Sequence, residues 1–244
     1  MNAVVDTKPT SDPKSRIIAA LDVPDLARLE AFLDRLEGQP IWYKIGLELF
    51  IAEGVRAIEA VKRRGGRLFL DLKLHDIPET VARAVTSVRR LGAELLTVHA
   101  AGGAEMTSRA VAAAEGQLDV IAVTVLTSLG QADLQADGIA GSPAEVVARR
   151  ARLVRDAGAA GLVCSPQEVA AARAIDPNLR LVVPGIRPAG AALGDQKRVG
   201  TPAEAIAGGA DYLVVGRPLR DAPNPARAFE ALAAEVASVI GAGR

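Results

Sequence analysis

Residues 67–76 read Arg67-Leu68-Phe69-Leu70-Asp71-Leu72-Lys73-Leu74-His75-Asp76. The apolar run that ends at Leu70 predicts a short buried strand. Alternate side chains of a strand share a face, so we expect Asp71 and Lys73 to point the same way at the strand end, with Asp76 just beyond in the loop. Burying charges costs desolvation free energy and rarely benefits stability. The cluster therefore indicates a binding or catalytic role, and a salt-bridge network at the rim is the alternative.

The rest of the chain repeats one unit, a short apolar strand followed by a helix. Runs rich in apolar and β-branched residues predict eight strands, at residues 16–21, 41–45, 67–70, 95–98, 120–125, 161–164, 179–183 and 212–215. Between them, apolar residues recur at helical spacing. Three later helices should begin at boxes of a cap residue, a proline and a glutamate, at residues 142–145, 165–168 and 201–204. Strands that alternate with helices predict right-handed crossovers and a parallel sheet.

Eight such units in about 230 residues match a (β/α)8 TIM barrel of the α/β class. We expect a single barrel domain over residues 16–244, preceded by a flexible leader at residues 1–15. An open doubly wound sheet is the alternative, but no Gly-x-Gly-x-x-Gly motif follows the first predicted strand. The leader is polar and lacks the apolar segment of a secretion signal.

The composition excludes several classes of function. Lys plus Arg number 29 and so do Asp plus Glu, and no basic block points to nucleic acid or a membrane surface. Aromatic residues make up only 3% of the chain, which argues against a base-stacking surface. The apolar runs are too short to span a bilayer. One cysteine, Cys164, allows no internal disulfide and no Cys-rich zinc site, so we expect a cytoplasmic protein.

In a TIM barrel, catalytic residues lie at the carboxyl ends of the strands. Polar and charged residues gather at these ends of the predicted strands, whereas the strands themselves are almost wholly apolar. In chain order the ends carry Asp22, Lys44, Asp71 with Lys73, His99, Thr124 with Thr127, Cys164 with Ser165, Arg187, and Gly216 with Arg217. We expect His99 to be a hydrogen-bonded structural residue and Cys164 a small core residue.

The loops after the seventh and eighth predicted strands have the composition of a phosphate site. They supply Gly185, Arg187, Gln196, Gly216 and Arg217. TIM barrels often bind phosphate at these two loops. Glycines let backbone N–H groups approach an anion, and an arginine can hold it bidentately. The long loop at residues 187–201 predicts a lid that closes over the phosphate.

Four segments of the chain resemble the orotidine 5′-phosphate decarboxylase family. They are Ala20-Leu21-Asp22; residues 69–80, with the pattern Asp-x-Lys-x-x-Asp-Ile-Pro-x-Thr; residues 123–128; and residues 184–188 together with Asp195-Gln196 and Gly216-Arg217-Pro218. The resemblance covers nearly all of the predicted barrel. It implies a TIM barrel that converts orotidine 5′-phosphate to UMP and carbon dioxide, the last step of de novo pyrimidine synthesis, without a cofactor or metal.

The resemblance also implies a role for each matched residue. Lys73 would protonate C6 of the pyrimidine after carbon dioxide leaves, and Asp71 would lie beside the departing carboxylate. Lys44 and Asp76 would complete an array of alternating charges, with Asp76 coming from the second subunit of a homodimer. The implied substrate contacts are Asp22 and Lys44 with the ribose, Thr80 of the neighbouring subunit with the ribose, Thr127 and Ser128 near the pyrimidine, and Arg187, Gln196, Gly216 and Arg217 with the phosphate.

The chemistry of this reaction suits those residues. Loss of carbon dioxide leaves a carbanion at C6 that the ring delocalises poorly. Most decarboxylases use a cofactor as an electron sink, and the sequence contains no motif for one. Without a cofactor, the carbanion can be stabilised by a fixed positive charge and protonated by an acid held next to C6. The ammonium of Lys73 can supply both. Repulsion between Asp71 and the substrate carboxylate can add to this, but we expect carbanion stabilisation to contribute most.

Three other functions stay open on the sequence. One is a magnesium-dependent phosphosugar enzyme, such as a keto-gulonate-phosphate decarboxylase or a hexulose-phosphate synthase. Such an enzyme has a similar charge array but would lose its activity in a chelator. A Schiff-base aldolase needs an uncharged lysine, whereas the flanking aspartates favour the charged form. A non-catalytic nucleotide-binding barrel would keep the phosphate arginines and have no use for Lys73.

Overall fold

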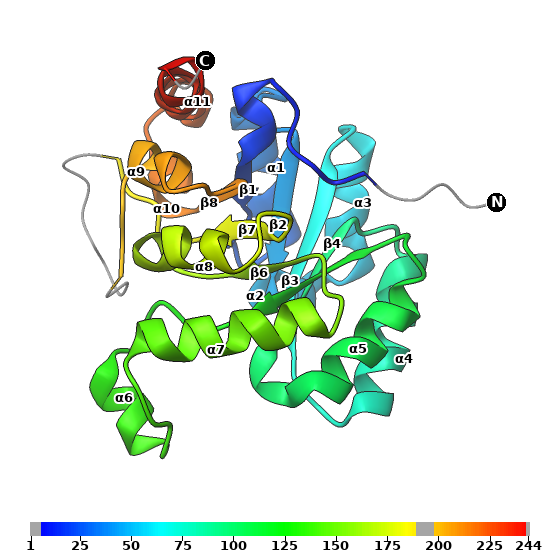
Figure 1. Cartoon of the computed structure of the whole chain (residues 1–244). Helices are drawn as coiled ribbons and strands as arrows, with labels where there is room; N and C mark the ends of the chain where they lie inside the picture. Colours follow the sequence, from blue (N-terminus) through cyan, green and yellow to red (C-terminus); the bar gives the residue numbers. More distant parts are fainter. Residues whose placement is uncertain (1–5, 189–197, 243–244) are drawn as a thin grey trace.

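The computed structural model describes residues 6–188 and 198–242, and within them the strands form a closed parallel barrel in chain order. Strand β8 pairs with β1, and helices surround the barrel (Figure 1). The strands are β1 Ile17–Ala20, β2 Trp42–Gly46, β3 Arg67–Leu74, β4 Leu95–His99, β5 Asp119–Val123, β6 Gly161–Val163, β7 Arg180–Val183 and β8 Tyr212–Val215. The predicted (β/α)8 barrel is confirmed, and all eight predicted strands are present.

Helices connect successive strands. They are α1 Leu26–Arg35, α2 Leu47–Glu53, α3 Val55–Arg63, α4 Pro78–Arg90, α5 Gly103–Ala114, α6 Gln131–Ala136, α7 Pro143–Asp156, α8 Val169–Ile175, α9 Pro202–Ala207, α10 Arg217–Arg220 and α11 Pro225–Ala242, with 3-10 turns η1 Pro13–Arg16, η2 Ala100–Gly102 and η3 Pro166–Glu168. The predicted capping boxes begin α7 and α9. The box at Ser165 begins η3, which precedes α8. None of the helices in the described ranges is long and apolar enough to cross a membrane.

The alternation of side chains along the strands divides the core into two layers. Outward-facing residues pack against the helices, and inward-facing ones fill the lumen. The inner layer includes Trp42 of β2, Phe69 of β3 and Leu95 of β4. Two residues further along each strand, the same alternation directs Lys44, Asp71 and Thr97 inward, toward the carboxyl ends. Strand periodicity therefore brings these polar side chains together above an apolar base.

Strand β3 runs to Leu74, beyond the predicted end at Leu70. Leu70 pairs with Leu96 and Leu74 pairs with Val98, so four positions of β3 span two positions of β4. Lys73 lies in this irregular stretch with a φ of 50°, the left-handed region that is unusual for a residue with a side chain. The prediction ended the strand at Leu70 because charged residues follow in the sequence. The backbone of β3 nevertheless pairs with β4 again at Leu74.

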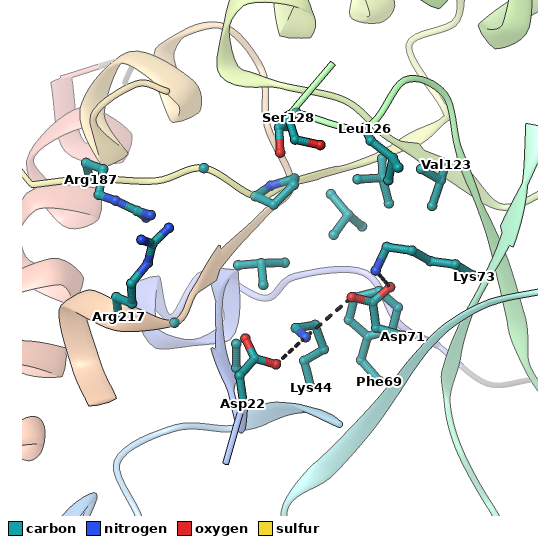
Figure 2. Close-up of a pocket in the computed structure, with 18 of the residues that line it drawn as sticks. Asp22, Lys44, Phe69, Asp71, Lys73, Val123, Leu126, Ser128, Arg187 and Arg217 are labelled. Atoms are coloured by element: carbon teal, nitrogen blue, oxygen red, sulfur yellow. Dashed lines mark hydrogen bonds and ion pairs between the residues drawn. The ribbon is translucent and has the colours of Figure 1, made fainter. Parts of the chain in front are cut away.

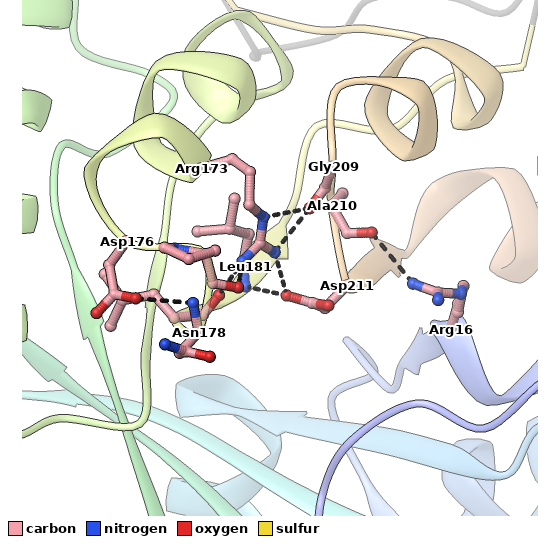
Figure 3. A network of polar contacts seen from close by, with 10 residues as sticks. Arg16, Arg173, Asp176, Asn178, Leu181, Gly209, Ala210 and Asp211 are labelled. Carbon is pink, nitrogen blue, oxygen red and sulfur yellow. Dashed lines mark hydrogen bonds and ion pairs between the residues drawn. The ribbon is translucent and has the colours of Figure 1, made fainter. Parts of the chain in front are cut away.

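Several arginines at the amino-terminal end of the barrel contact an aromatic ring or a carboxylate. The guanidinium of Arg67 lies 4.2 Å from the ring centre of Trp42, and Arg180 pairs with Asp119 at 3.2 Å. Figure 3 shows Arg173 between the backbone of Gly209 and the carboxylate of Asp211, which it meets at 2.6 Å. These charges hold strand ends and loops together, which is the role expected at the end of a TIM barrel opposite its catalytic site.

Part of the predicted leader packs against this end of the barrel. Thr7 is fully buried and donates its hydroxyl to Asp119, the first residue of β5. Arg67 donates to the backbone carbonyl of Asp6 at 2.7 Å, and Lys14 pairs with Glu230 of α11 at 2.8 Å. Residues 6–15 thus contact the barrel, while the division of the chain at residue 16 stays a prediction.

Candidate active site

A cavity of about 490 Å³ opens at the carboxyl ends of the strands, where the sequence predicts the site. Asp22, Lys44, Asp71, Lys73, Thr127, Ser128, Arg187, Gly216 and Arg217 all line it. These residues come from the ends of β1, β2, β3, β5, β7 and β8, or from the loops that follow them. The closed barrel therefore brings together residues that are nearly 200 positions apart in the chain.

Four of these residues form a continuous row of alternating charges (Figure 2). The ammonium nitrogen of Lys44 lies 2.9 Å from Asp22 Oδ1 and 3.4 Å from Asp71 Oδ2. The ammonium nitrogen of Lys73 lies 2.7 Å from Asp71 Oδ1. Each oxygen of the Asp71 carboxylate thus faces a different lysine.

The row is buried at its centre and more open at Lys73. The side chains of Lys44 and Asp71 are 9% and 12% exposed, whereas that of Lys73 is 31% exposed. Burial disfavours the charged carboxylate of Asp71, but Lys44 and Lys73 outweigh it and lower the pKa of Asp71. Burial likewise disfavours the Lys44 ammonium, but Asp71 and Asp22 outweigh it and raise the pKa of Lys44. The paired charges hold each other in the ionised state, so the site presents fixed charge to whatever binds there.

Asp76 and Thr80 do not line this cavity. The carboxylate of Asp76 is exposed and accepts a hydrogen bond from the backbone N–H of Ile77 at 2.6 Å, just before α4. Thr80 is exposed in the first turn of α4. One chain therefore brings Asp22, Lys44, Asp71 and Lys73 together and leaves these two residues on its surface.

The opposite end of the cavity carries two arginines. Figure 2 shows the side chains of Arg187 and Arg217 facing one another, on the side away from Lys73. The backbone of Arg187 donates to the carbonyl of Gly200 at 3.0 Å, and Gly200 donates to the carbonyl of Gly185 at 3.3 Å. This pairing fixes the start of the predicted phosphate loop. Gln196 lies outside the described residues.

Several residues that line the cavity were given no role by the sequence analysis. Its walls include Phe69, Val123, Val125, Leu126, Val163, Val182, Pro184, Val214 and Arg220. Most of them are inward-facing strand residues, so the strand period could have identified them. The buried Arg198 pairs with Glu168 and donates to the carbonyl of Leu126, a residue of the cavity lining, at 2.8 Å. No local pattern marks Arg198, because its partners lie far away in the sequence.

Two residues at the strand ends have surroundings that fit structural roles. The ring of His99 packs 5.5 Å from that of His75 outside the cavity lining, and burial, followed by the charge of His75, lowers the pKa of His99. Within the described residues its contact is this ring packing, and the predicted side-chain hydrogen bond is not found. Cys164 is fully buried in the outer core, and burial raises the pKa of its thiol. The prediction of a core cysteine is confirmed.

The closed barrel, with a charged cavity at the carboxyl ends of its strands, has the architecture of a TIM-barrel enzyme. The chain belongs to the orotidine 5′-phosphate decarboxylase / HUMPS family, whose family model matches residues 15–232. The resemblance seen in the four sequence segments is therefore confirmed.

Curated relatives and solved structures agree with this assignment. The orotidine 5′-phosphate decarboxylase of Anaeromyxobacter sp. (strain K) is 59% identical over 223 residues, which cover 91% of this chain and 98% of that protein. The protein of the same name from Moorella thermoacetica is 50% identical, with 93% of this chain and 94% of that protein covered. The crystal structure of orotidine 5′-phosphate decarboxylase from Lactobacillus acidophilus superposes with a TM-score of 0.80 at 34% identity, over 90% of this chain and 98% of that chain.

Proposed function

We propose that this protein decarboxylates orotidine 5′-phosphate to UMP and carbon dioxide, the last step of de novo pyrimidine synthesis. The observation that carries the proposal is the row Asp22–Lys44–Asp71–Lys73, which lies in one cavity with Arg187 and Arg217. The relatives named above carry this activity in their names and match nearly the whole chain.

In the proposed reaction the bond between C6 and the carboxylate carbon breaks, and its electron pair stays on C6. The ammonium of Lys73 stabilises this developing negative charge and then transfers a proton to C6. The products are UMP, carbon dioxide and a neutral Lys73 amine, which regains a proton from water. Because the pair of Lys73 with Asp71 is already formed at 2.7 Å, the ammonium needs little reorganisation as the charge develops.

Asp71 has a second effect in this mechanism. Its carboxylate would face the substrate carboxylate, and two such charges ~4 Å apart repel by about 4 kcal/mol at an effective dielectric of ~20. That repulsion is relieved as carbon dioxide leaves. Lys44 and Lys73 offset much of it, since one faces each oxygen of Asp71. Stabilisation of the carbanion is therefore the main contribution in our proposal.

The two arginines would hold the phosphate, with Gly216 and Gln196 beside it. Two guanidinium groups that face the same end of the cavity create the positive potential that a phosphate dianion requires. This end is remote from Lys73, so phosphate binding can orient the pyrimidine without taking part in the chemistry. Asp22 and Lys44 would contact the ribose, and Thr127 and Ser128 the pyrimidine.

We also propose a homodimer in which Asp76 and Thr80 reach the partner's site. Among the described residues, the large apolar side chains that are exposed are Leu47, Ile51, Val55 and Ile77. They follow β2 and β3, which are neighbours in the barrel, and Ile77 is adjacent to Asp76. An apolar surface of this kind supports contact with another protein chain, and a second copy would cover it. A cytoplasmic location is also our proposal, and cell fractionation would test it.

A direct assay tests the function. Purified protein and orotidine 5′-phosphate are mixed in EDTA, and the change in pyrimidine absorbance and the released carbon dioxide are measured. We expect full conversion to UMP at the same rate with and without the chelator. A rate that falls in EDTA and returns with magnesium would instead favour a magnesium-dependent phosphosugar enzyme of the same broad group.

A further inference from the structure

Thr97 lies next to the charge row and has no role in the proposed function so far. It belongs to β4, two residues after Leu95 of the inner layer, so its side chain enters the lumen at the level of Asp71. It is fully buried. Burying a hydroxyl costs desolvation free energy unless the hydroxyl is hydrogen-bonded, so the Thr97 hydroxyl needs partners inside the barrel.

The hydroxyl of Thr97 joins two parts of the row. It accepts a hydrogen bond from the backbone N–H of Lys73 at 2.9 Å and donates one to Asp71 Oδ1 at 3.0 Å. The direction of both bonds is fixed, because an N–H can only donate and an ionised carboxylate can only accept. One hydroxyl therefore connects the backbone of Lys73 to the carboxylate that holds its ammonium.

The irregular pairing of β3 with β4 explains why this connection is needed. Between Leu70 and Leu74 the regular register is interrupted, and in the same stretch Lys73 adopts its left-handed φ of 50°. Irregular strand pairing of this kind re-aims side chains near active sites. At Lys73 the backbone N–H donates to the Thr97 hydroxyl, a side-chain group of the neighbouring strand. The unusual backbone and the Asp71 carboxylate are thus held by the same atom.

We propose that Thr97 is a positioning residue for decarboxylation, whose hydroxyl fixes the Lys73 backbone and the Asp71 carboxylate relative to one another. This inference rests on the proposed function and adds a residue to its machinery. Thr97 does not touch the substrate in this account, since it lies behind Asp71 and is absent from the cavity lining. Its effect should therefore fall on kcat and leave KM nearly unchanged.

The test compares Thr97→Val, Thr97→Ser and Thr107→Val. Valine keeps the size and β-branching of threonine and removes both hydrogen bonds, whereas serine retains the hydroxyl. Thr107 is the matched control, because it is also fully buried but its hydroxyl bonds within α5, to Gly103 at 2.9 Å. Since a hydrogen bond to a charged group is lost, we expect Thr97→Val to lower kcat about 10- to 100-fold. KM should stay within about threefold, and both Thr97→Ser and Thr107→Val should stay near wild type.

Hydrogen–deuterium exchange of the segment at residues 70–76 supplies a readout that does not depend on activity. Thr97→Val should speed exchange of the Lys73 amide, and Thr97→Ser should not. A wild-type kcat in Thr97→Val, or a loss in Thr97→Ser equal to that in Thr97→Val, would overturn the inference. An inactive wild-type protein would instead refute the proposed function, and unchanged Lys73 exchange in Thr97→Val would separately refute the role of the hydroxyl.

Discussion

The ammonium of Lys73 lies 2.7 Å from the carboxylate of Asp71, and a single residue separates the two in strand β3. The left-handed backbone at Lys73 and the hydroxyl of Thr97 accompany this short pairing. Lys44 neutralises the other oxygen of Asp71 at 3.4 Å. The proposed proton donor is thus held in place before any substrate binds, and the predictions below depend on that arrangement.

Replacing Lys73 should abolish decarboxylation. Lys73→Ala removes both the proton donor and the charge that faces the carbanion, so we expect kcat to fall by about 10⁴-fold or more. Binding of UMP, measured by calorimetry, should change far less because the phosphate end is intact. Lys62→Ala is the control, since Lys62 is exposed on α3. Near-normal turnover by Lys73→Ala would show that the mechanism is wrong.

Replacing Arg217 should mainly weaken binding of the phosphorylated substrate. Loss of a charge-assisted hydrogen bond predicts a decrease of about 10- to 100-fold in kcat/KM for orotidine 5′-phosphate. Turnover of orotidine, which has no phosphate, should be nearly unchanged. Arg227→Ala, at an exposed position of α11, should behave like wild type. An equal loss on both substrates in Arg217→Ala would argue against phosphate binding at this end.

Mixing two inactive variants tests the dimer. If Asp76 acts in the partner's site, a heterodimer of Lys73→Ala and Asp76→Ala subunits contains one intact site. Random association makes about half of the dimers mixed, so about one quarter of all sites should recover. Activity after mixing, unfolding and refolding together should be compared with each variant treated alone. Absence of recovery would mean that each chain forms its site without the partner.

The contribution of Asp71 and Lys44 to stability should be insensitive to pH near neutrality. The lowered pKa of Asp71 means that its ionised form stabilises the fold above its unfolded pKa of about 3.9, and that this contribution is lost as the pH falls through the lower, folded value. The raised pKa of Lys44 keeps its contribution intact up to its unfolded value of about 10.4.

Urea unfolding of wild type and Asp71→Asn provides the measurement. The difference between their free energies of unfolding should be constant from about pH 5 to about pH 8. Below about pH 4 the wild type should lose stability relative to the variant. A difference that changes between pH 5 and pH 8 would contradict the direction of the Asp71 shift.

The sequence predicted the barrel well because the relevant signals are local. Apolar runs, helical spacing and capping boxes each depend on neighbouring residues, and the strand ends follow from them. The predicted charges at those ends, from Asp22 to Arg217, do share one cavity. This succeeded because parallel strands in a closed barrel place all their carboxyl ends at one side.

The features that the sequence did not predict depend on contacts between distant segments. The extension of β3 past Leu70 needs β4 as a partner, and the position of Thr97 matters only because β4 lies beside the irregular stretch. Arg198 stabilises a loop more than 70 residues away, at Leu126. A polar residue in an apolar run signals a buried partner, but only the fold identifies that partner.

The contact of Thr7 with Asp119 determines where a support or a fusion partner can be attached to the protein. Asp119 begins β5, so the amino-terminal segment meets the barrel at the end opposite the cavity. A surface, label or fusion partner attached near Asp6 would therefore lie at the end of the barrel opposite the cavity. The fold thus provides an attachment point for an immobilised biocatalyst that leaves the route of substrate entry and product exit clear.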